Sequence, residues 1–527
     1  MMLTISYMKF LNRCILPLLT LVSVMCSCNG NKENPEPTPD PTPKAPTAIT
    51  LSTSSLSAKA EGETFEITVK TPFVPQVEKP DWVTVSNGTL KDYTVTVNVV
   101  VDANSTYEAR EATLTFKATG ATSASLKVTQ AAKEKPVRPT PGTNAAWQMA
   151  TKLGFGWNMG NEMEAHRNGV PDETCWTGVL CTQATFTKVK EAGFSSVRIP
   201  VSWMSLIGEA PNYTLDATRL ARLKEIVGYA HNAGLITIFN LHHDGADSNY
   251  WLSIRQNADN NAILNEIAAV WTQLAEAFKN EGDWLMFESF NEIHDGLGSS
   301  GGWGYSPEYQ TEAGKKRQND VLNGWNQKFV DVVRATGGNN ETRWLGVPGY
   351  AANPEYTLND GFVVPNDPAK HVMVAVHTYG PYEFGQTAAV NEWGHTRKVK
   401  LQDPSYDEDF YEDQMYRLYK KWVEKGIPVY FGEFGCANRS DDKAYAFQLY
   451  FLEYMTKCMH TYGMSGFIWD NGAVGAGNEI YGIIHHGTGE YLDSVKGPKI
   501  LSTCWKAFTN TSSSYTLDTV YNSAPKF

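Results

Sequence analysis

Two glutamates in this chain of 527 residues each lie in a short apolar segment. Glu292 ends the segment FESFNE at 287–292, and Glu433 lies within VYFGEFG at 429–435. A carboxylate is costly to bury, so one that ends a buried strand is expected to have a function. Two carboxyl groups about 5–5.5 Å apart can cleave a glycosidic bond with retention of configuration. The sequence therefore predicts that Glu292 and Glu433 are the carboxylate pair of a retaining glycoside hydrolase.

The residues near this pair indicate which glutamate has which role. Asn291 precedes Glu292, and a neighbouring amide can hold the sugar 2-hydroxyl as charge develops. We therefore expect Glu292 to be the acid/base and Glu433 to be the nucleophile. We also expect Tyr379 to donate a hydrogen bond to Glu433 and Arg198 to supply a fixed positive charge beside it.

The elements that position these residues follow from a repeated pattern between 144 and 527. Apolar segments alternate there with amphipathic helical segments, which is typical of βα units and a parallel sheet. The predicted strands are LGFGWN, SSVRIP, LITIFNL, LMFESFN, RWLGVPG, VMVAVH, PVYFGE and SGFIWD. Predicted helices include 216–233, 262–280, 320–336 and 411–425. Eight such units predict an α/β fold, a (β/α)8 TIM barrel with long loops on its active face.

Polar and aromatic residues gather at the carboxyl ends of the predicted strands, which meet at one rim of such a barrel. They are Trp157, Asn158, Arg198, His242, His243, Asn291, Glu292, His377, Glu433 and Trp469. We expect Trp469 to form a platform under the sugar at the cleaved bond. Glu288 has the strand parity of Glu292, and we expect it to partner Arg198 or to form a structural ion pair.

These segments resemble a known family. RIPVSW, NLHHDG, FNEI, HTY, GEFG and WDNG occur in the order typical of glycoside hydrolase family 5, and WNMGNEMEA, ETCW and HHDG resemble its subfamily 4, endo-β-1,4-glucanases and xyloglucanases. The resemblance implies Glu292 as acid/base and Glu433 as nucleophile. It places Arg198, His242, His243, Asn291, His377, Tyr379 and Trp469 around the cleaved bond. Glu162, where the subfamily usually has Thr, and Thr177-Gly178, in place of Gly-Asn-Pro, depart from its pattern.

Aromatic residues on the predicted loops favour an open groove that holds a long polysaccharide. They are Trp157, Trp176, Trp203, Trp251, Trp303, Tyr382 and Trp393. With Asn158 and Trp176 among the substrate-binding residues, the expected substrate is a cellulosic, mixed-linkage or xyloglucan β-glucan. A β-mannanase or other β-glycanase on the same barrel, and a catalytically idle surface glycan-binding protein, remain alternatives.

The amino-terminal segment predicts export. Residues 1–28 have a weakly basic start and an apolar stretch too short to span a bilayer, and they end in Cys26-Ser27-Cys28. This resembles a bacterial lipoprotein signal with Cys28 as the lipidated residue. We expect anchoring to the outer membrane, at the cell surface or on the periplasmic face. Residues 29–46 are Pro-rich, which predicts an extended linker.

A small β-domain is predicted between two linkers. Residues 47–132 contain short alternating strands that suggest an immunoglobulin-like all-β sandwich, and 133–143 form a second Pro-rich linker. PDWVTVS around Trp82, EATLTF and VTQ resemble a BACON domain. Trp82 is expected in the core, because no cluster of exposed aromatics accompanies it. We expect this domain to act as a spacer, and whether it binds glycan stays open.

Composition limits the other partners. The net charge of −12 provides no basic surface for nucleic acid. Five cysteines follow the signal, so at least one is a free thiol; Cys175 and Cys181 are expected to form a disulfide. The pair His485-His486 lacks a carboxylate spaced to complete a metal site. We expect a monomer that needs no cofactor.

Overall fold

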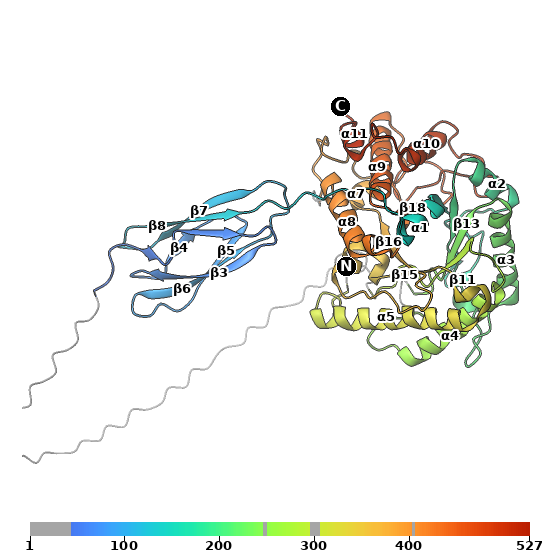
Figure 1. Ribbon diagram of the computed structural model, residues 1–527, viewed down its shortest axis with the longest axis horizontal. Helices are drawn as coiled ribbons and strands as arrows, with labels where there is room; N and C mark the ends of the chain where they lie inside the picture. Colours follow the sequence, from blue (N-terminus) through green and yellow to red (C-terminus); the bar gives the residue numbers. More distant parts are fainter. Residues whose placement is uncertain (1–43, 246–249, 296–305, 403–405) are drawn as a thin grey trace, which may run out of the picture. The chain divides into compact units, whose positions relative to one another are not determined.

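The computed structural model describes residues 44–245, 250–295, 306–402 and 406–527. The chain forms two compact units, Met1–Glu134 and Lys135–Phe527, which are described separately (Figure 1). The predicted signal peptide, the lipidation site Cys28 and Trp303 lie outside the described residues. No helix in the described ranges is both long enough and apolar enough to cross a bilayer.

The first unit is a sandwich of two four-stranded sheets. One sheet has the order β1 (Thr50–Leu51), β3 (Glu63–Lys70), β6 (Thr94–Val101), β5 (Val83–Asn87). The other has the order β2 (Ser55–Ala58), β8 (Ala124–Gln130), β7 (Arg110–Lys117), β4 (Gln76–Glu78). Alternate residues of β6 are buried, because successive side chains of a strand point to opposite faces. Trp82 packs against this core with the Arg110 guanidinium 4.5 Å from its ring centre, as expected for a core residue.

The second unit is a closed barrel of eight parallel strands, which confirms the predicted fold. The strands are β9 (Phe155–Asn158), β12 (Ser196–Ile199), β13 (Ile236–Asn240), β14 (Leu285–Glu288), β15 (Leu345–Pro348), β16 (Val372–Thr378), β17 (Val429–Phe434) and β18 (Ser465–Ile468). Six of the eight predicted apolar segments contain their strand, and β16 and β17 each extend one residue beyond VMVAVH and PVYFGE. Nearly every strand residue is buried, because the barrel interior and the helices cover both faces.

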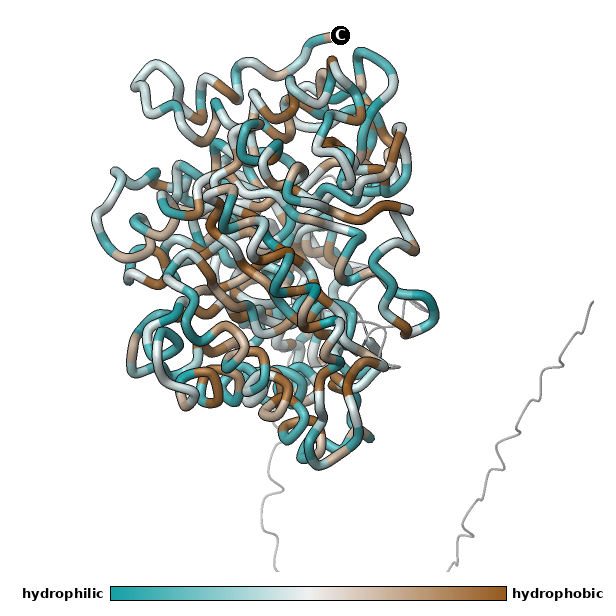
Figure 2. The backbone as a smooth tube through the Cα atoms, turned by 90° about the vertical axis from the view of Figure 1, so that its right-hand side faces the viewer, coloured by the Kyte–Doolittle hydropathy of each residue, from teal (hydrophilic) through white to brown (hydrophobic). Residues whose placement is uncertain are grey.

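Helices surround this barrel (Figure 1). They are α1 (Ala145–Leu153), α2 (Gln183–Glu191), α3 (Ala217–Asn232), α4 (Asn260–Ala277), α5 (Glu312–Ala335), α6 (Pro354–Asn359), α7 (Tyr382–Gly385), α8 (Glu408–Lys421), α9 (Asp442–Thr461), α10 (Lys496–Thr509) and α11 (Leu517–Tyr521). In Figure 2, hydrophobic and hydrophilic residues alternate along the helical coils, as expected for helices with one buried face.

Side-chain caps decide where several helices begin. Helix α5 begins at Glu312, eight residues before the predicted start, because Thr311 accepts a hydrogen bond from the Gly314 amide. Asp407 caps α8 in the same way, so this helix also begins earlier than predicted. The predicted helix 411–425 is divided, since α8 ends at Lys421 and the 3₁₀ turn η4 (Val423–Lys425) follows.

The loop between β9 and α2 contains a short hairpin of β10 (His166–Arg167) and β11 (Val170–Pro171). It also carries Cys175 and Cys181, which are free thiols, so the predicted disulfide is wrong. Cys181 is buried, and its Sγ lies 3.7 Å from Glu173 Oε1. Six positions along a chain do not ensure the short Cβ separation that a disulfide requires.

Candidate active site

The two glutamates predicted from the sequence lie together at the carboxyl ends of the barrel strands. Glu433 is in β17, whereas β14 ends at Glu288 and Glu292 lies in the loop that follows it. His377 Nδ1 lies 2.7 Å from Glu292 Oε1 and 3.7 Å from Glu433 Oε1. One oxygen of each glutamate and this nitrogen all lie within 4.8 Å of one another. The two carboxyl groups therefore face each other at short range across the barrel mouth.

Strand irregularities place two of these groups. The register of β16 against β17 shifts between Val376 and His377, and that of β17 against β18 shifts between Phe431 and Phe434. A bulge or irregularity of this kind redirects a side chain relative to the regular alternation. His377 and Glu433 are consequently register partners at the rim.

Glu433 has two donors aimed at its carboxylate. Arg198 Nη1 donates to Oε1 at 2.8 Å, and the Tyr379 hydroxyl donates to Oε2 at 2.8 Å. Both contacts were expected from the sequence. Burial, together with the nearby Glu433 charge, raises the pKa of Tyr379 well above its usual value, so Tyr379 remains a protonated donor.

Arg198 is held by a buried network. Its Nε and Nη2 donate to the Glu288 carboxylate at 2.7–3.2 Å, which confirms Glu288 as its partner. Glu288 also accepts hydrogen bonds from Asn240 (2.8 Å) and Tyr430 (2.6 Å). Burial alone would lower the pKa of Arg198, but the Glu288 and Glu433 charges outweigh it and raise this pKa. Arg198 is therefore a permanent cation between two carboxylates.

Asn158 belongs to this network and not to a substrate surface. The side chain is fully buried, with its amide nitrogen donating to the carbonyls of Gly432 and Phe467 and its Oδ1 accepting from Arg198 at 3.1 Å. The expectation that Asn158 contacts substrate is therefore wrong, because all its polar atoms already serve the protein. Asn291 Oδ1 accepts from Arg198 Nη2 at 2.8 Å, which fixes its amide group beside Glu292.

The three histidines of the rim are neutral. Burial lowers the pKa of His377 to about 4 and that of His243 to about 3, and it lowers the pKa of His242 well below the usual value. Nearby Arg198 opposes protonation of His242 and His377. His242 Nε2 lies 3.8 Å from Glu433 Oε1, within the site as expected. Arg198 thus supplies the positive charge next to Glu433.

The aromatic residues of the predicted groove fall into two groups. Trp157, Trp203 and Trp393 are fully buried core residues, so their assignment to the groove is wrong. Trp176 and Tyr382 are 44% and 62% exposed, and Trp251 is half-buried. A tryptophan at a strand end and one in a loop look alike in sequence, and packing alone separates them.

Trp469 is half-buried at the end of β18 and stacks beside His242, with ring centroids 6.1 Å apart and planes 7° from parallel. Gly160 lies against this ring. A Cβ at position 160 would be 2.8 Å from both the ring and the Asp470 carbonyl oxygen, so only glycine fits there. Trp176 contacts His243 edge-on at 5.6 Å between centroids.

Sequence reasoning missed two residues of the network, Asn240 and Tyr430. Each is a polar group inside an otherwise apolar strand segment, LITIFNL or PVYFGE. That signal was available, because buried polar groups require partners. Their shared partner, Glu288, could not be predicted without the register of the barrel strands.

A parallel eight-stranded barrel with two facing glutamates at its carboxyl-end rim defines the class of (β/α)8 glycoside hydrolases. The comparisons give the family. Residues 160–475 match the model of Cellulase (glycosyl hydrolase family 5), and residues 74–131 match BACON, a putative binding domain. The chain belongs to glycosyl hydrolase family 5 and is a glycoside hydrolase, as the sequence motifs led us to expect.

Its relatives include Endoglucanase A of Paenibacillus barcinonensis, 37% identical over 344 residues that cover 62% of this chain and 82% of that protein. A GH5-4 broad specificity endoglucanase from Bacteroides salanitronis is a similar solved structure, with 44% identity, a TM-score of 0.66, and coverage of 72% of this chain and 99% of that one. A family 5 xyloglucanase from Paenibacillus pabuli has 35% identity, a TM-score of 0.62, and coverage of 69% and 100%.

Proposed function

We propose that this chain is a retaining endo-β-1,4-glucanase in which Glu433 is the nucleophile and Glu292 the acid/base. The observation that carries this assignment is the unequal environment of the two glutamates. Glu433 faces the Arg198 cation and the Tyr379 hydroxyl, whereas Glu292 faces the neutral His377. A nucleophile must be an anion and an acid must hold a proton, so the charged surroundings suit Glu433.

The reaction follows in two balanced steps. A Glu433 oxygen attacks the anomeric carbon while Glu292 gives its proton to the departing glycosidic oxygen, which leaves a glycosyl ester on Glu433. Glu292, now a carboxylate, takes a proton from water, and that water oxygen displaces Glu433 from the sugar. Asn291, oriented by Arg198, is placed to hold the 2-hydroxyl of the same sugar. Trp469 provides the apolar floor.

The substrate class is inferred from the relatives and the exposed aromatic residues. The similar proteins are endoglucanases, a broad specificity endoglucanase and a xyloglucanase. Trp176 and Tyr382 offer surfaces for further sugar rings on the loops. We therefore infer cleavage within cellulosic, mixed-linkage or xyloglucan chains.

A hydrolysis panel on defined polysaccharides tests this substrate. We expect a rapid fall in the viscosity of β-glucans with oligosaccharide products. Monosaccharide as the main early product would contradict endo cleavage, and activity on mannan alone would favour a β-mannanase. No turnover of any β-glycan would favour a surface glycan-binding protein.

The roles have their own test. Glu433→Gln should abolish turnover, whereas Glu292→Ala should still react with activated aryl glycosides, whose leaving group needs no proton. Azide should rescue the Glu292→Ala variant and yield the β-glycosyl azide. Formation of the β-glycosyl azide by the Glu433 variant instead would reverse the two roles.

We also propose that the chain is exported and lipid-anchored at Cys28. The support is the sequence pattern of residues 1–28. Cells given labelled palmitate should label the wild-type chain, and Cys28→Ser should release it in soluble form. Continued membrane attachment of this variant would contradict anchoring at Cys28.

A further inference from the structure

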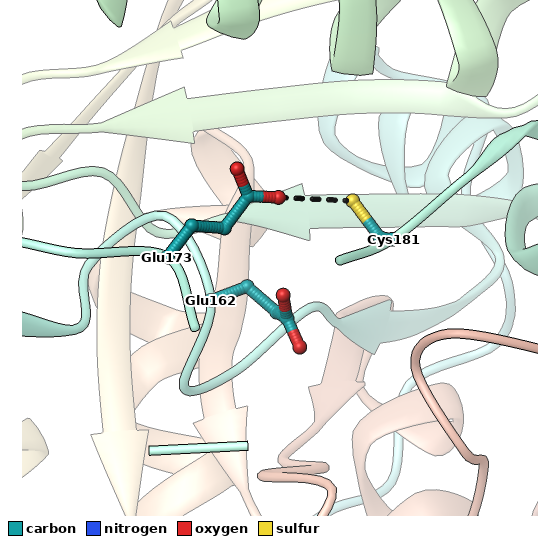
Figure 3. A group of neighbouring side chains, drawn as sticks. All are labelled: Glu162, Glu173 and Cys181. Carbon is teal, nitrogen blue, oxygen red and sulfur yellow. Dashed lines mark hydrogen bonds between the residues drawn. The ribbon is translucent and has the colours of Figure 1, made fainter. Parts of the chain in front are cut away.

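A second group of ionisable side chains lies in the loop between β9 and α2, apart from the glutamate pair. It consists of Glu162, Glu173 and Cys181, all buried (Figure 3). One carboxylate oxygen from each glutamate and the Cys181 sulfur lie within 4.8 Å of one another. The proposed hydrolysis uses none of the three.

Glu162 has one oxygen for which the described residues provide no partner. Its Oε1 accepts from the Thr177 hydroxyl at 2.9 Å and contacts His486 Nδ1 at 3.2 Å. Its Oε2 is buried and has no hydrogen-bond partner among the described residues. Leaving a buried carboxylate oxygen unpaired costs free energy, so a ligand that supplies a positive centre would be stabilised there.

The spacing of the other two groups suits a tetrahedral metal ion. The Cys181 thiol donates a hydrogen bond to Glu173 Oε1, with sulfur and oxygen 3.7 Å apart (Figure 3). With a Zn–S distance of about 2.3 Å and a Zn–O distance of about 2.0 Å, tetrahedral geometry separates sulfur and oxygen by about 3.5 Å. Arg222 donates to both Glu173 oxygens at 2.6 and 2.9 Å, which holds this carboxylate in place. Arg222 Nη2 also donates to the Cys181 sulfur at 3.6 Å.

We propose that Glu162, Glu173 and Cys181 bind a thiophilic divalent cation, with Zn²⁺ as the best fit of ligand type and geometry. A bond forms between the metal and Cys181 Sγ, the thiol proton leaves to solvent, and water takes the fourth position.

The site would fasten the loop that carries Trp176. Glu173 and Cys181 lie on either side of Trp176 in the sequence, and Thr177 is hydrogen-bonded to Glu162. A metal bound by these ligands closes this segment as a disulfide would, with Trp176 held next to His243. A lower KM for polysaccharide in the metal-bound enzyme is the expected consequence, and this consequence alone rests on the proposed function.

Cobalt titration of the chelator-treated full chain tests the metal site without measuring activity. Co²⁺ bound to a thiolate gives a charge-transfer absorption in the near ultraviolet, and we expect it to saturate at one equivalent. Cys181→Ser should remove the band, and the matched control Cys175→Ser should keep it, because Cys175 lies outside the cluster. A cobalt ion at Glu292, His377 and Glu433 would give no such band, since that group has no sulfur.

Glu162→Gln keeps the thiol and the side-chain volume, so it tests the site even where Cys181→Ser does not fold. We expect its affinity for Co²⁺ and Zn²⁺ to fall at least about tenfold. A missing band in the wild-type chain would overturn the proposal. So would a band that survives Cys181→Ser, or an affinity unchanged by Glu162→Gln.

Discussion

His377 and His486 are both buried histidines next to carboxylates, yet His377 is neutral and His486 is positively charged. The pKa of His377 is lowered to about 4, first by burial, while the Arg198 charge offsets part of the opposite effect of Glu433. Burial also acts to lower the pKa of His486, but hydrogen bonds to Asp470 (3.3 Å) and Glu162 (3.2 Å) raise it to about 9. The comparison shows that burial alone does not set the charge of a histidine. At His486 the hydrogen bonds and charges of two carboxylates together outweigh burial, whereas at His377 burial prevails.

The largest expected effect is the loss of stability in His486→Gln, which should exceed the loss in His377→Gln. His486→Gln removes the cation between two buried carboxylates and should lower the free energy of unfolding by about 3–5 kcal/mol. His377→Gln removes only neutral hydrogen bonding and should cost about 1–2 kcal/mol. Urea unfolding of both variants at pH 7 measures the difference. Equal losses would mean that the two histidines do not differ in charge.

A second prediction concerns the donors around Glu433. Tyr379→Phe removes a hydrogen bond to a charged group, worth about 1.5–3 kcal/mol, so kcat should fall about 10- to 100-fold. The matched control is Tyr481→Phe, whose hydroxyl donates to the Gly385 carbonyl and not to Glu433. An unchanged kcat in Tyr379→Phe would show that Arg198 alone suffices to hold Glu433.

A third prediction concerns the share of the pH dependence of stability that comes from neutral His377. The pKa of His377 is lower in the folded chain, at about 4, than the usual unfolded value of about 6.5. The unfolded chain therefore binds the proton first, and stability falls as pH drops from 6.5 toward 4. At pH 5 this loss is about 2 kcal/mol. Buried His242 and His243 add losses of the same sign. The difference in stability between pH 7 and pH 5 should therefore be smaller in His377→Gln than in the wild type by about 2 kcal/mol.

Exposed His231 provides the control for this pH experiment. His231→Gln should keep the wild-type difference between pH 7 and pH 5. If His377→Gln also keeps the full difference, His377 is not a neutral group in the folded chain.

The smallest expected effect concerns Trp176. Trp176→Ala removes one sugar–aromatic contact of about 1 kcal/mol, so KM for polysaccharide should rise several-fold with little change in kcat. Trp505→Ala is the control, because Trp505 is similarly exposed but lies on α10 beside Gly193, which precedes β12 at the opposite end of the barrel. A changed kcat in Trp176→Ala would indicate that Trp176 also positions the reacting sugar.

Much of the fold could be predicted because the barrel strands are continuous apolar segments such as VMVAVH, and no solvent-exposed face interrupts them. Glu292, Glu433, Arg198 and Tyr379 could be predicted because charged or polar groups at strand ends are rare unless they have a function. The family motifs indicated the same four residues independently.

The remainder depends on three-dimensional packing. Asn158 stands at a strand end like the other rim residues, but its amide is enclosed by the backbone of β17 and β18. Trp157, Trp203 and Trp393 likewise meet the core instead of solvent. Cys175 and Cys181 are near in sequence, while the direction of each side chain is set by the loop. None of these directions is encoded in residue spacing alone.

Gly160 has a consequence for altering this protein by directed evolution. Any side chain at this position would collide with the Trp469 ring. Substitutions there should therefore displace the platform that we propose for the sugar. Trp176 and Tyr382 have no such constraint from neighbouring backbone, since their rings extend into solvent. Variation in substrate preference should therefore be sought at those two loop positions, while position 160 remains glycine in every active variant.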